Sequence, residues 1–306
     1  MTNVMPTPPP GTGPELLAVG ETMAMVAPLT GDRLAEAEHF RLDAGGAESN
    51  VAAHVAALGH RAGWFSRLGD DALGRRVRAQ LKARGVDVSS VITDPVHPTG
   101  LYVKDPGNGV RYYRAGSAAS QLSIADAELV DLRGVRILHV SGITAAISDS
   151  AAGFLRRLMR RARDAGVLVS FDVNHRLALW DCAVAADALA ALARRADLVF
   201  TGRDEAESLW GTVSASEVRA HFADVPELVV KDGSIGATTY LGDQEVFEPA
   251  LVVDVVDVVG AGDAFAGGYL AALLEGATPA ERLRAGHRRA ALTLQTTGDS
   301  IDERVL

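Results

Sequence analysis

The segment 257–268 holds the residues best suited to chemistry. Asp263 directly follows the glycine-rich stretch Gly260-Ala261-Gly262, and helix-compatible residues continue to Glu275. We expect a strand, a glycine turn and then a helix. Glycines let backbone N–H groups converge at a helix N-terminus, which favours an anion such as a phosphoryl group in transit. A carboxylate beside that anion would be repelled by it, so it is better used to accept a proton from an attacking hydroxyl. The alternative is an aspartate that caps a structural turn.

A second glycine-rich turn begins at Lys231, after the apolar run Leu228 to Val230, and has the sequence Lys-Asp-Gly-Ser-Ile-Gly. Its glycines would let the backbone approach a ligand, and an ordinary hairpin turn is the alternative. Lysine is scarce in this chain, since only Lys82, Lys104 and Lys231 occur. A lysine in a glycine-rich setting is therefore a candidate functional residue.

Charge and composition exclude several classes of protein. The 306 residues include 30 basic and 39 acidic side chains, a formal charge of -9, which is the wrong sign for broad attraction to nucleic acid or anionic membranes. Cys182 is the only cysteine, so neither an intrachain disulfide nor a Cys-type zinc site can form. P-loop, dinucleotide and His-Glu-x-x-His motifs are missing. We expect a cytoplasmic protein with no nucleic-acid partner and no membrane span.

The elements that must position these residues alternate along the chain. Short apolar runs look like buried strands, and stretches rich in Ala, Leu, Arg and Glu between them have helix length. The runs are 16–20, 135–140, 167–171, 198–200 and 228–230, and the helical stretches are 149–165, 187–195, 214–223 and 279–294. This alternation predicts an α/β fold with a mostly parallel sheet covered by helices on both faces. Ligands bind beyond the carboxyl ends of strands in such sheets.

Two segments, about 24–43 and 100–114, break the alternation. They carry strand-like residues without a helical period, and the sequence Asp-Pro-Gly-Asn-Gly at 105–109 is a strong hairpin signal. We expect small antiparallel strands that form a lid or an oligomer edge, although a plain surface hairpin is the alternative. Residues 1–13, with four prolines, read as a flexible tail, and 14–306 as one domain with the lid segments inserted.

The glycine segment resembles the second signature of the ribokinase-like (PfkB) family of sugar kinases, Asp-x-x-Gly-Ala-Gly-Asp-Ala-Phe-x-x-Gly. The family's first signature is matched at 45–52 by Gly-Gly-Ala-Glu-Ser-Asn-Val-Ala. This resemblance implies a doubly wound α/β domain with a small β lid that transfers the γ-phosphoryl group of ATP to a sugar hydroxyl. By the same resemblance Asp263 is the catalytic base, and the amides of Gly260, Ala261 and Gly262 form an anion hole.

The resemblance also implies a nucleotide site and Mg²⁺. The residues that it assigns to the nucleotide are Asn174, Lys231, Gly233, Gly236, Gly260 and Gly262. Glu205 matches the glutamate of the family's Asn-x-x-Glu motif, which places Mg²⁺ through water, but Gly202 stands where the asparagine would be. A solvated carboxylate at a helix start is the alternative for Glu205. Val258 replaces the usual threonine, which weakens any inference of a monovalent-cation site.

Two arginines point to an acidic substrate. Arg114 follows Tyr112-Tyr113 in a lid segment, and Arg176 lies just past the strand that ends near Phe171. A guanidinium pairs with a carboxylate through two parallel hydrogen bonds, whereas a neutral sugar needs no such clamp. Salt bridges within the protein are the alternative. Alternation along a strand places Tyr112 and Tyr113 on opposite sides, so at most one faces a substrate.

Both segments resemble those of 2-keto-3-deoxygluconate kinases. The residues that this resemblance assigns to the keto acid are Gly46, Asn50, Tyr102, Tyr112, Arg114, Arg176 and Asp299. It implies phosphorylation of the C6 hydroxyl by ATP. The alternatives are a fructokinase-type or ribokinase-type kinase for a neutral sugar, and a non-catalytic sugar or nucleotide sensor on the same fold. We also expect a homo-oligomer through the lid strands, because exposed β edges readily pair with a second copy.

Overall fold

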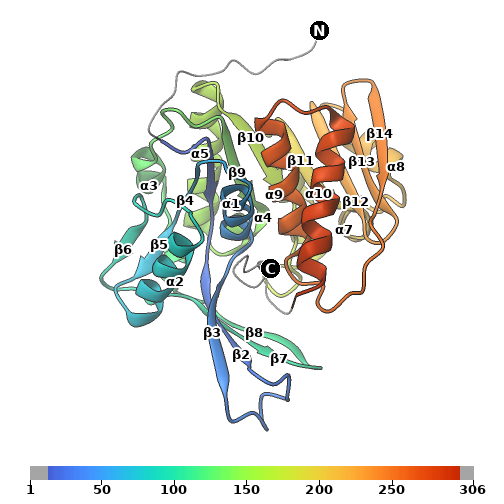
Figure 1. The fold of residues 1–306 in the computed structure, drawn as a ribbon. Helices are drawn as coiled ribbons and strands as arrows, with labels where there is room; N and C mark the ends of the chain where they lie inside the picture. The colour runs from blue at the N-terminus through green and yellow to red at the C-terminus, as the bar shows by residue number, and fades with distance from the viewer. Residues whose placement is uncertain (1–12, 297–306) are drawn as a thin grey trace.

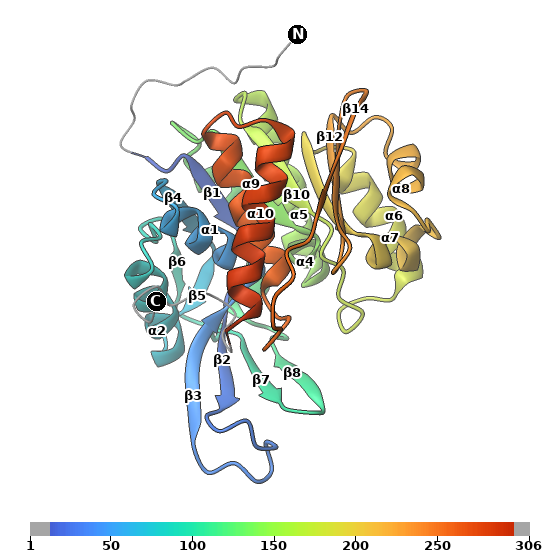
Figure 2. The same ribbon diagram turned by 45° about the vertical axis from the view of Figure 1, so that its right-hand side comes forward.

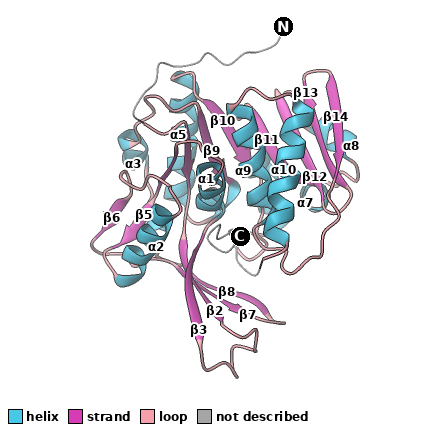
Figure 3. Cartoon of the chain, in the orientation of Figure 1, coloured by secondary structure: helices cyan, strands magenta, loops and turns pink. Residues whose placement is uncertain are grey.

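The computed structural model describes residues 13–296 and contains one large sheet with helices on both faces (Figure 1, Figure 3). The predicted tail lies outside the described residues except for Gly13. In spatial order the eight strands of the sheet are β14 (Gln244–Pro249), β13 (Gly236–Leu241), β12 (Glu227–Asp232), β11 (Leu198–Gly202), β10 (Leu168–Asp172), β9 (Ile137–Ser141), β1 (Leu16–Val19) and β4 (Ala62–Phe65). The strands from β12 to β4 are parallel, and β13 and β14 add an antiparallel edge. The predicted α/β fold is therefore confirmed.

Helices cover both faces, as the alternation predicts. One face carries α1 (Ala47–Ala57), α2 (Ala72–Ala83), α9 (Ala261–Leu274) and α10 (Pro279–Leu294). The other carries α3 (Ile124–Leu129), α4 (Gly142–Ala146), α5 (Asp149–Asp164), α6 (Cys182–Ala193), α7 (Arg203–Trp210) and α8 (Ala215–His221). No helix within residues 13–296 is long and apolar enough to cross a membrane.

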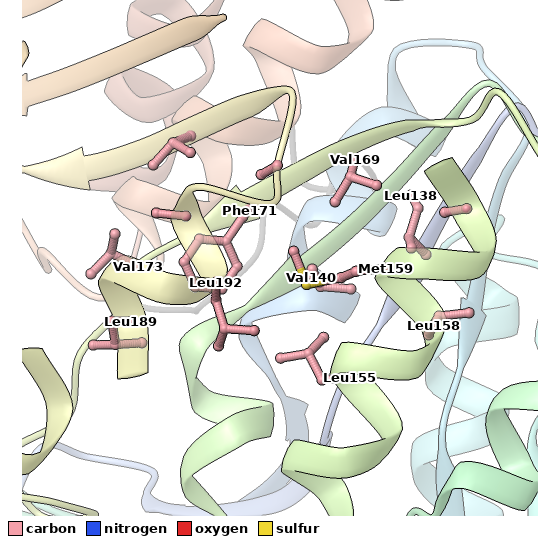
Figure 4. Packing of buried hydrophobic residues seen from close by; sticks show 14 of the residues in the cluster. Leu138, Val140, Leu155, Leu158, Met159, Val169, Phe171, Val173, Leu189 and Leu192 are labelled. Atoms are coloured by element: carbon pink, nitrogen blue, oxygen red, sulfur yellow. The ribbon is translucent and has the colours of Figure 1, made fainter. Parts of the chain in front are cut away.

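Each face has its own apolar core. On the α5 face, Leu155, Leu158 and Met159 point at Leu138 and Val140 of β9 (Figure 4). Their spacing places them on one side of the helix, and the arginines of α5 lie on the other. On the opposite face α9 is buried from Ala264 to Leu274, because it lies between the sheet, α1 and α10. This central helix begins at the glycine turn, so the core fixes the position of the turn.

A second, four-stranded sheet projects from the body of the protein (Figure 1, Figure 2). Its order is β3 (Phe40–Gly45), β2 (Met23–Pro28), β7 (Leu101–Asp105) and β8 (Gly109–Tyr113). The strands predicted in the two lid segments are present, and each segment pairs antiparallel within itself, β2 with β3 and β7 with β8, as expected. The join between the two hairpins has the other direction. β2 and β7 pair in parallel, because the two hairpins come from distant parts of the chain and meet side by side. A separate parallel pair joins β5 (Arg67–Gly69) and β6 (Ile92–Asp94).

The prediction of a strand just before the glycine turn is wrong. Residues 250–260 form an irregular loop, and Val252, Val255 and Val258 are exposed. Their β-branched side chains favour a strand, but no neighbouring strand pairs with them. The amides of Val256 and Asp257 instead bond to the carbonyl of Leu294 at the end of α10, at 2.7 and 3.3 Å. The loop is therefore attached to a helix end and leads directly into α9.

Candidate active site

A cavity of about 630 Å³ lies where the carboxyl ends of β1, β10, β11 and β12 meet the second sheet. This is the edge at which a parallel α/β sheet binds ligands. Segments far apart in the sequence contribute to its walls. The predicted site residues that line it are Gly46, Asn50, Tyr102, Tyr112, Arg114, Asn174, Arg176, Glu205, Lys231, Gly260, Gly262 and Asp263.

Asp263 lies in the first turn of α9 and faces this cavity. The N-cap of the helix is Gly260, so the alternative of a capping aspartate is wrong. The Asn50 side-chain amide donates to Oδ2 of Asp263 over 2.9 Å. Burial raises the pKa of Asp263 to about 6, although the Asn50 hydrogen bond and the nearby Arg176 charge act to lower it. A carboxylate with this pKa is ionised at neutral pH and is a competent proton acceptor.

Close packing of α1 against α9 brings Asn50 to Asp263. A Cβ at Gly267 of α9 would lie 2.5 Å from Cβ of His54 in α1, so the helices need glycine at this contact. The turn itself needs glycine at Gly260, whose φ of 82° is left-handed. The first N–H groups of α9 have no partner within the helix and carry the positive end of its dipole, although the Ala261 amide donates to the Val258 carbonyl over 3.3 Å. Gly260 and Gly262 line the cavity, whereas Ala261 between them does not.

A lysine and two carboxylates lie beside the glycine turn. Nζ of Lys231 is 3.0 Å from Oδ2 of Asp172, the last residue of β10. The same Nζ would be 3.6 Å from a Cβ at Gly262. Although burial opposes its charge, Asp172, Glu205 and Asp263 together raise the pKa of Lys231. A fixed positive charge therefore lies at the turn where an anion would bind.

Glu205 is held at the start of α7. Its carboxylate accepts the amides of His175 and Gly202 over 2.5 and 3.1 Å, and the Thr201 hydroxyl over 3.0 Å. Burial and the charge of Asp172 raise its pKa. Glu205 does lie at a helix start, but the alternative of a solvated carboxylate is wrong, because protein donors surround this carboxylate and it also lines the cavity.

The donors present fit Mg²⁺ shared with a phosphate ligand. Within residues 13–296 no group of three or more His, Cys, Asp or Glu side chains could hold a metal ion by itself. Mg²⁺ is commonly bound through one or two carboxylates together with substrate phosphates and waters. Asp172 and Glu205 both line the cavity and supply oxygen donors of that kind.

Asn174 follows β10 in an unusual conformation. Its φ is 43°, and it is the one non-glycine residue with positive φ in the described part of the chain. Asparagine tolerates this left-handed region better than most residues. The strained backbone holds the buried Asn174 in the cavity wall between Asp172 and Arg176.

Aromatic residues of the second sheet form the opposite wall. Tyr102 and Tyr112 are cross-strand partners, and their ring centroids are 5.9 Å apart. Gly45 leaves room for Tyr102, because a Cβ there would lie 2.0 Å from the tyrosine hydroxyl. Tyr112 lines the cavity and Tyr113 does not, as strand alternation predicts.

The two arginines differ in their partners. Arg114 forms a salt bridge with Glu21, and its guanidinium carbon lies 5.6 Å from the centre of the Tyr112 ring. Arg176 is exposed, and no residue among 13–296 forms an ion pair with it. Both line the cavity. Glu21 offsets the charge of Arg114, whereas the charge of Arg176 has no ion-pair partner among residues 13–296 and acts on Asp263.

Besides Ala261, two predicted residues among those described do not line the cavity. Gly233 and Gly236 belong to the hairpin between β12 and β13 and do not line it. Gly236 is required by packing, because a Cβ there would lie 2.4 Å from the carbonyl oxygen of Glu248. Asp299 lies outside the described residues.

Four charged lining residues were missed in the sequence, namely Glu21, Lys104, Asp172 and Asp204, the last of which is the neighbour of the predicted Glu205. Glu21 and Asp172 lie at the carboxyl ends of β1 and β10, so the rule that ligands bind there could have found them. Lys104 stands out only because lysine is scarce. In the structure Lys104 reaches from β7 to Asp257 in the loop before the glycine turn, with Nζ 3.6 Å from the carboxylate.

Comparison with known proteins relates this chain to carbohydrate kinases. The profile of the pfkB family carbohydrate kinases matches residues 14–304. A 2-dehydro-3-deoxygluconokinase from Bacillus subtilis (strain 168) is 37% identical over 294 residues, which cover 93% of this chain and 91% of that protein. Fructokinase-2 from Zea mays is 33% identical over 264 residues, covering 83% and 78%. The crystal structure of a PfkB protein from Polaromonas sp. JS666 superposes with a TM-score of 0.85 at 34% identity, covering 94% of this chain and 97% of that one. The chain belongs to the pfkB family of carbohydrate kinases.

Proposed function

We propose that this carbohydrate kinase uses ATP to phosphorylate the C6 hydroxyl of 2-keto-3-deoxygluconate, the compound also called 2-dehydro-3-deoxygluconate. One observation carries the proposal: Asp263 faces a single cavity that has the glycine turn beside it and arginines on its walls. The similarity to a 2-dehydro-3-deoxygluconokinase over most of the chain supports the choice of substrate.

In the proposed reaction Asp263 accepts the proton of the sugar hydroxyl. The hydroxyl oxygen forms a bond to the γ-phosphorus of ATP, the bond from that phosphorus to the β–γ bridging oxygen breaks, and ADP leaves. The chain supplies alignment and charge, which is most of what phosphoryl transfer requires. Amides at the start of α9 and the ammonium of Lys231, which lies beside the turn, would stabilise the negative charge on the transferring group.

The nucleotide and Mg²⁺ belong on the β10–β12 side of the cavity. Asn174 and Lys231 would contact the phosphates, and the hairpin glycines Gly233 and Gly236 would lie along the nucleotide. Asp172 and Glu205 would hold Mg²⁺, directly or through water, and the ion would screen the phosphate charge. Gly202 in place of the family's asparagine offers no side chain here, and its amide donates to Glu205 instead.

The sugar acid belongs on the side of the second sheet, which serves as a lid. Gly46 and Asn50 lie at the start of α1, and Tyr112 and Arg114 come from the lid. Arg176 stands across from them with no ion-pair partner in the part of the chain that is described. An acid with one carboxylate would balance this charge. Pairing of lid strands between two copies remains a prediction.

A kinase for a neutral sugar is the second candidate, and the Arg114–Glu21 salt bridge favours it. This pair removes one positive charge from the sugar side, so the electrostatic preference for an acid rests mainly on Arg176. The fructokinase relatives favour the same alternative. A sensor without catalysis is disfavoured, because the base and its hydrogen-bond partner are both in place.

The test is a substrate panel with direct product analysis. Purified protein would be incubated with ATP, Mg²⁺ and either 2-keto-3-deoxygluconate, 2-keto-3-deoxygalactonate, fructose or ribose. Product would be quantified by mass spectrometry, and the phosphorylated carbon identified by ³¹P–¹H NMR. We expect kcat/KM to be highest for 2-keto-3-deoxygluconate and Asp263→Asn to abolish most turnover. A higher kcat/KM for fructose would replace the proposed substrate, and binding without ADP formation would support the sensor.

A further inference from the structure

Glu21 is a buried carboxylate in the wall of the cavity that the reaction proposed above does not use. It follows Gly20 at the carboxyl end of β1, and its side chain has no exposed surface. Its Oε2 accepts from both Nε and Nη2 of Arg114, with the Nε contact at 2.7 Å. Its Oε1 accepts the Ser117 hydroxyl over 2.6 Å. Both oxygens therefore have partners that lie more than ninety residues away in the sequence.

The surrounding chain leaves room for this carboxylate. A Cβ at Gly100, which leads into β7, would lie 2.8 Å from Oε1 of Glu21. The carbonyl of Gly20 accepts the indole N–H of Trp64 over 3.2 Å, which fixes the backbone from which Glu21 projects. A buried ion pair is often no more stable than an apolar pair of the same volume. Stability alone therefore gives little reason to place this pair here.

The pair leaves one edge of the Arg114 guanidinium available. A guanidinium has two edges that can each donate two hydrogen bonds to a carboxylate. One edge consists of Nε and Nη2, and the other of Nη1 and Nη2. Glu21 takes the first edge. No described residue accepts from Nη1 of Arg114, whose side chain is 10% exposed and lines the cavity. The Tyr112 ring lies 5.6 Å from the guanidinium carbon, so a third group restricts its plane.

We propose that Glu21 is a positioning residue for substrate specificity, which holds Arg114 so that its second edge receives the carboxylate of the sugar acid. This inference rests on the proposed function. Because Glu21 offsets the charge of Arg114, the two arginines have different tasks. Arg114 supplies a fixed geometry for two parallel hydrogen bonds, and Arg176 supplies an exposed charge that has no ion-pair partner in the described part of the chain.

The inference predicts where kinetic effects fall. Glu21→Gln keeps the size of the side chain and one acceptor oxygen but loses the charge that orients the guanidinium. We expect it to raise KM for 2-keto-3-deoxygluconate by about tenfold, a loss of one charge-assisted hydrogen bond, with kcat changed much less. KM for ATP should stay within twofold, because Glu21 lies on the sugar side. If Glu21 only repelled the substrate carboxylate, the change in KM would have the opposite sign. Removal of its charge would then make the site more positive and lower KM for the acid.

A double-mutant cycle separates positioning from a structural role. Glu21→Gln, Arg114→Gln and the double variant would be compared in melting temperature and in KM for both substrates. Each single change should lower the melting temperature, because it leaves a buried group without its ionic partner, and the double variant should recover part of that loss. KM for the keto acid should stay raised in the double variant. Ser117→Ala, which removes only the neutral hydroxyl contact, is the control for disturbance of the same carboxylate.

The outcomes distinguish this inference from the proposed function. Recovery of KM for the keto acid in the double variant would show that the pair is structural and would overturn the inference. Unchanged or lowered KM in Glu21→Gln would do the same. If the wild-type enzyme phosphorylates only neutral sugars, the proposed substrate fails and this inference fails with it. Wild-type turnover of the keto acid together with an unaffected Glu21→Gln variant would refute the inference alone.

Discussion

The protonation of Asp263 should set the acid limit of catalysis. Burial raises the pKa of this carboxyl to about 6, and the ionised form is the one that accepts a proton. With that pKa about 90% of the enzyme is ionised at pH 7 and about 10% at pH 5. We therefore expect kcat/KM to fall about tenfold for each pH unit well below 6.

Asn50→Leu should shift the acid limb of the pH profile, the range in which kcat/KM falls as the pH is lowered, to higher pH. Asn50 donates to the carboxylate over 2.9 Å and thereby lowers the pKa of Asp263. A hydrogen bond to a charged group contributes about 1.5–3 kcal/mol, and 1.36 kcal/mol corresponds to one pKa unit, so the shift should be roughly one to two units. Asn50 is also a predicted substrate contact, so the midpoint of the limb is the informative quantity rather than the absolute rate. Ser49→Ala, on the same turn of α1, should leave the midpoint unchanged.

The measurement needs an assay that is independent of coupling enzymes. Product would be quantified by mass spectrometry from pH 5 to 8 at constant ionic strength and saturating Mg²⁺. Asp263→Asn is the control. If the fall in rate at low pH reflects protonation of this carboxyl and not of ATP, the residual rate of the variant should not fall in that range. We expect that residual rate to be about 10²–10⁴ lower than wild type. A flat wild-type profile down to pH 5, or an unmoved midpoint in Asn50→Leu, would refute the assignment of Asp263 as a buried base.

Three further predictions concern residues around the cavity. Gly20→Ala should destabilise the fold by about 1–3 kcal/mol in chemical denaturation, because its Cβ would lie 2.1 Å from the buried carboxyl of Glu48. Gly153→Ala in α5, whose new Cβ would meet nothing closer than 3.6 Å, should be neutral or stabilising. Burial raises the pKa of Glu48 from 4.5 to about 7, so the folded state holds this proton more tightly and loses up to roughly 3 kcal/mol as pH rises through that window. Glu48→Gln should lack that loss, and equal pH dependence of unfolding in both proteins would contradict it. Lys231→Met should lower kcat and raise the pKa of Asp263, which would appear as an acid limb at higher pH.

The central part of the site could be predicted because the topology of a parallel sheet is a strong constraint. Asn50 and Asp263 are 213 positions apart, yet each lies in the first turn or two of a helix at the carboxyl ends of the strands. When strands alternate with helices along the chain, the residues that follow each strand all lie at that edge of the sheet. The sequence could not show that Asn50 donates to Asp263, because this contact depends on how closely α1 and α9 pack.

Local sequence was misleading where tertiary partners decide the structure. The valines at 252–259 have high strand propensity, but a strand needs a neighbour, and the edge of the sheet is already formed by β14. The direction in which β2 and β7 pair depends in the same way on how two separate hairpins meet. Strand propensity describes one segment at a time. It could therefore predict neither the loop at 252–259 nor the parallel pairing of β2 with β7.

The arginines show why charge in a site cannot be counted from sequence. Arg114 and Arg176 were both expected to attract an acid, and a sum of formal charges gives two positive groups. The structure pairs Arg114 with the buried Glu21, while Arg176 has no such partner among residues 13–296. Electrostatic attraction and directional recognition are therefore assigned to different side chains. Added salt should then raise KM for an acidic substrate in the wild type and much less in Arg176→Gln, since exposed charges are screened within about 10 Å at 0.1 M salt. In Arg114→Gln the salt dependence should persist although KM is higher, and equal salt dependence in all three proteins would show that neither arginine attracts the substrate.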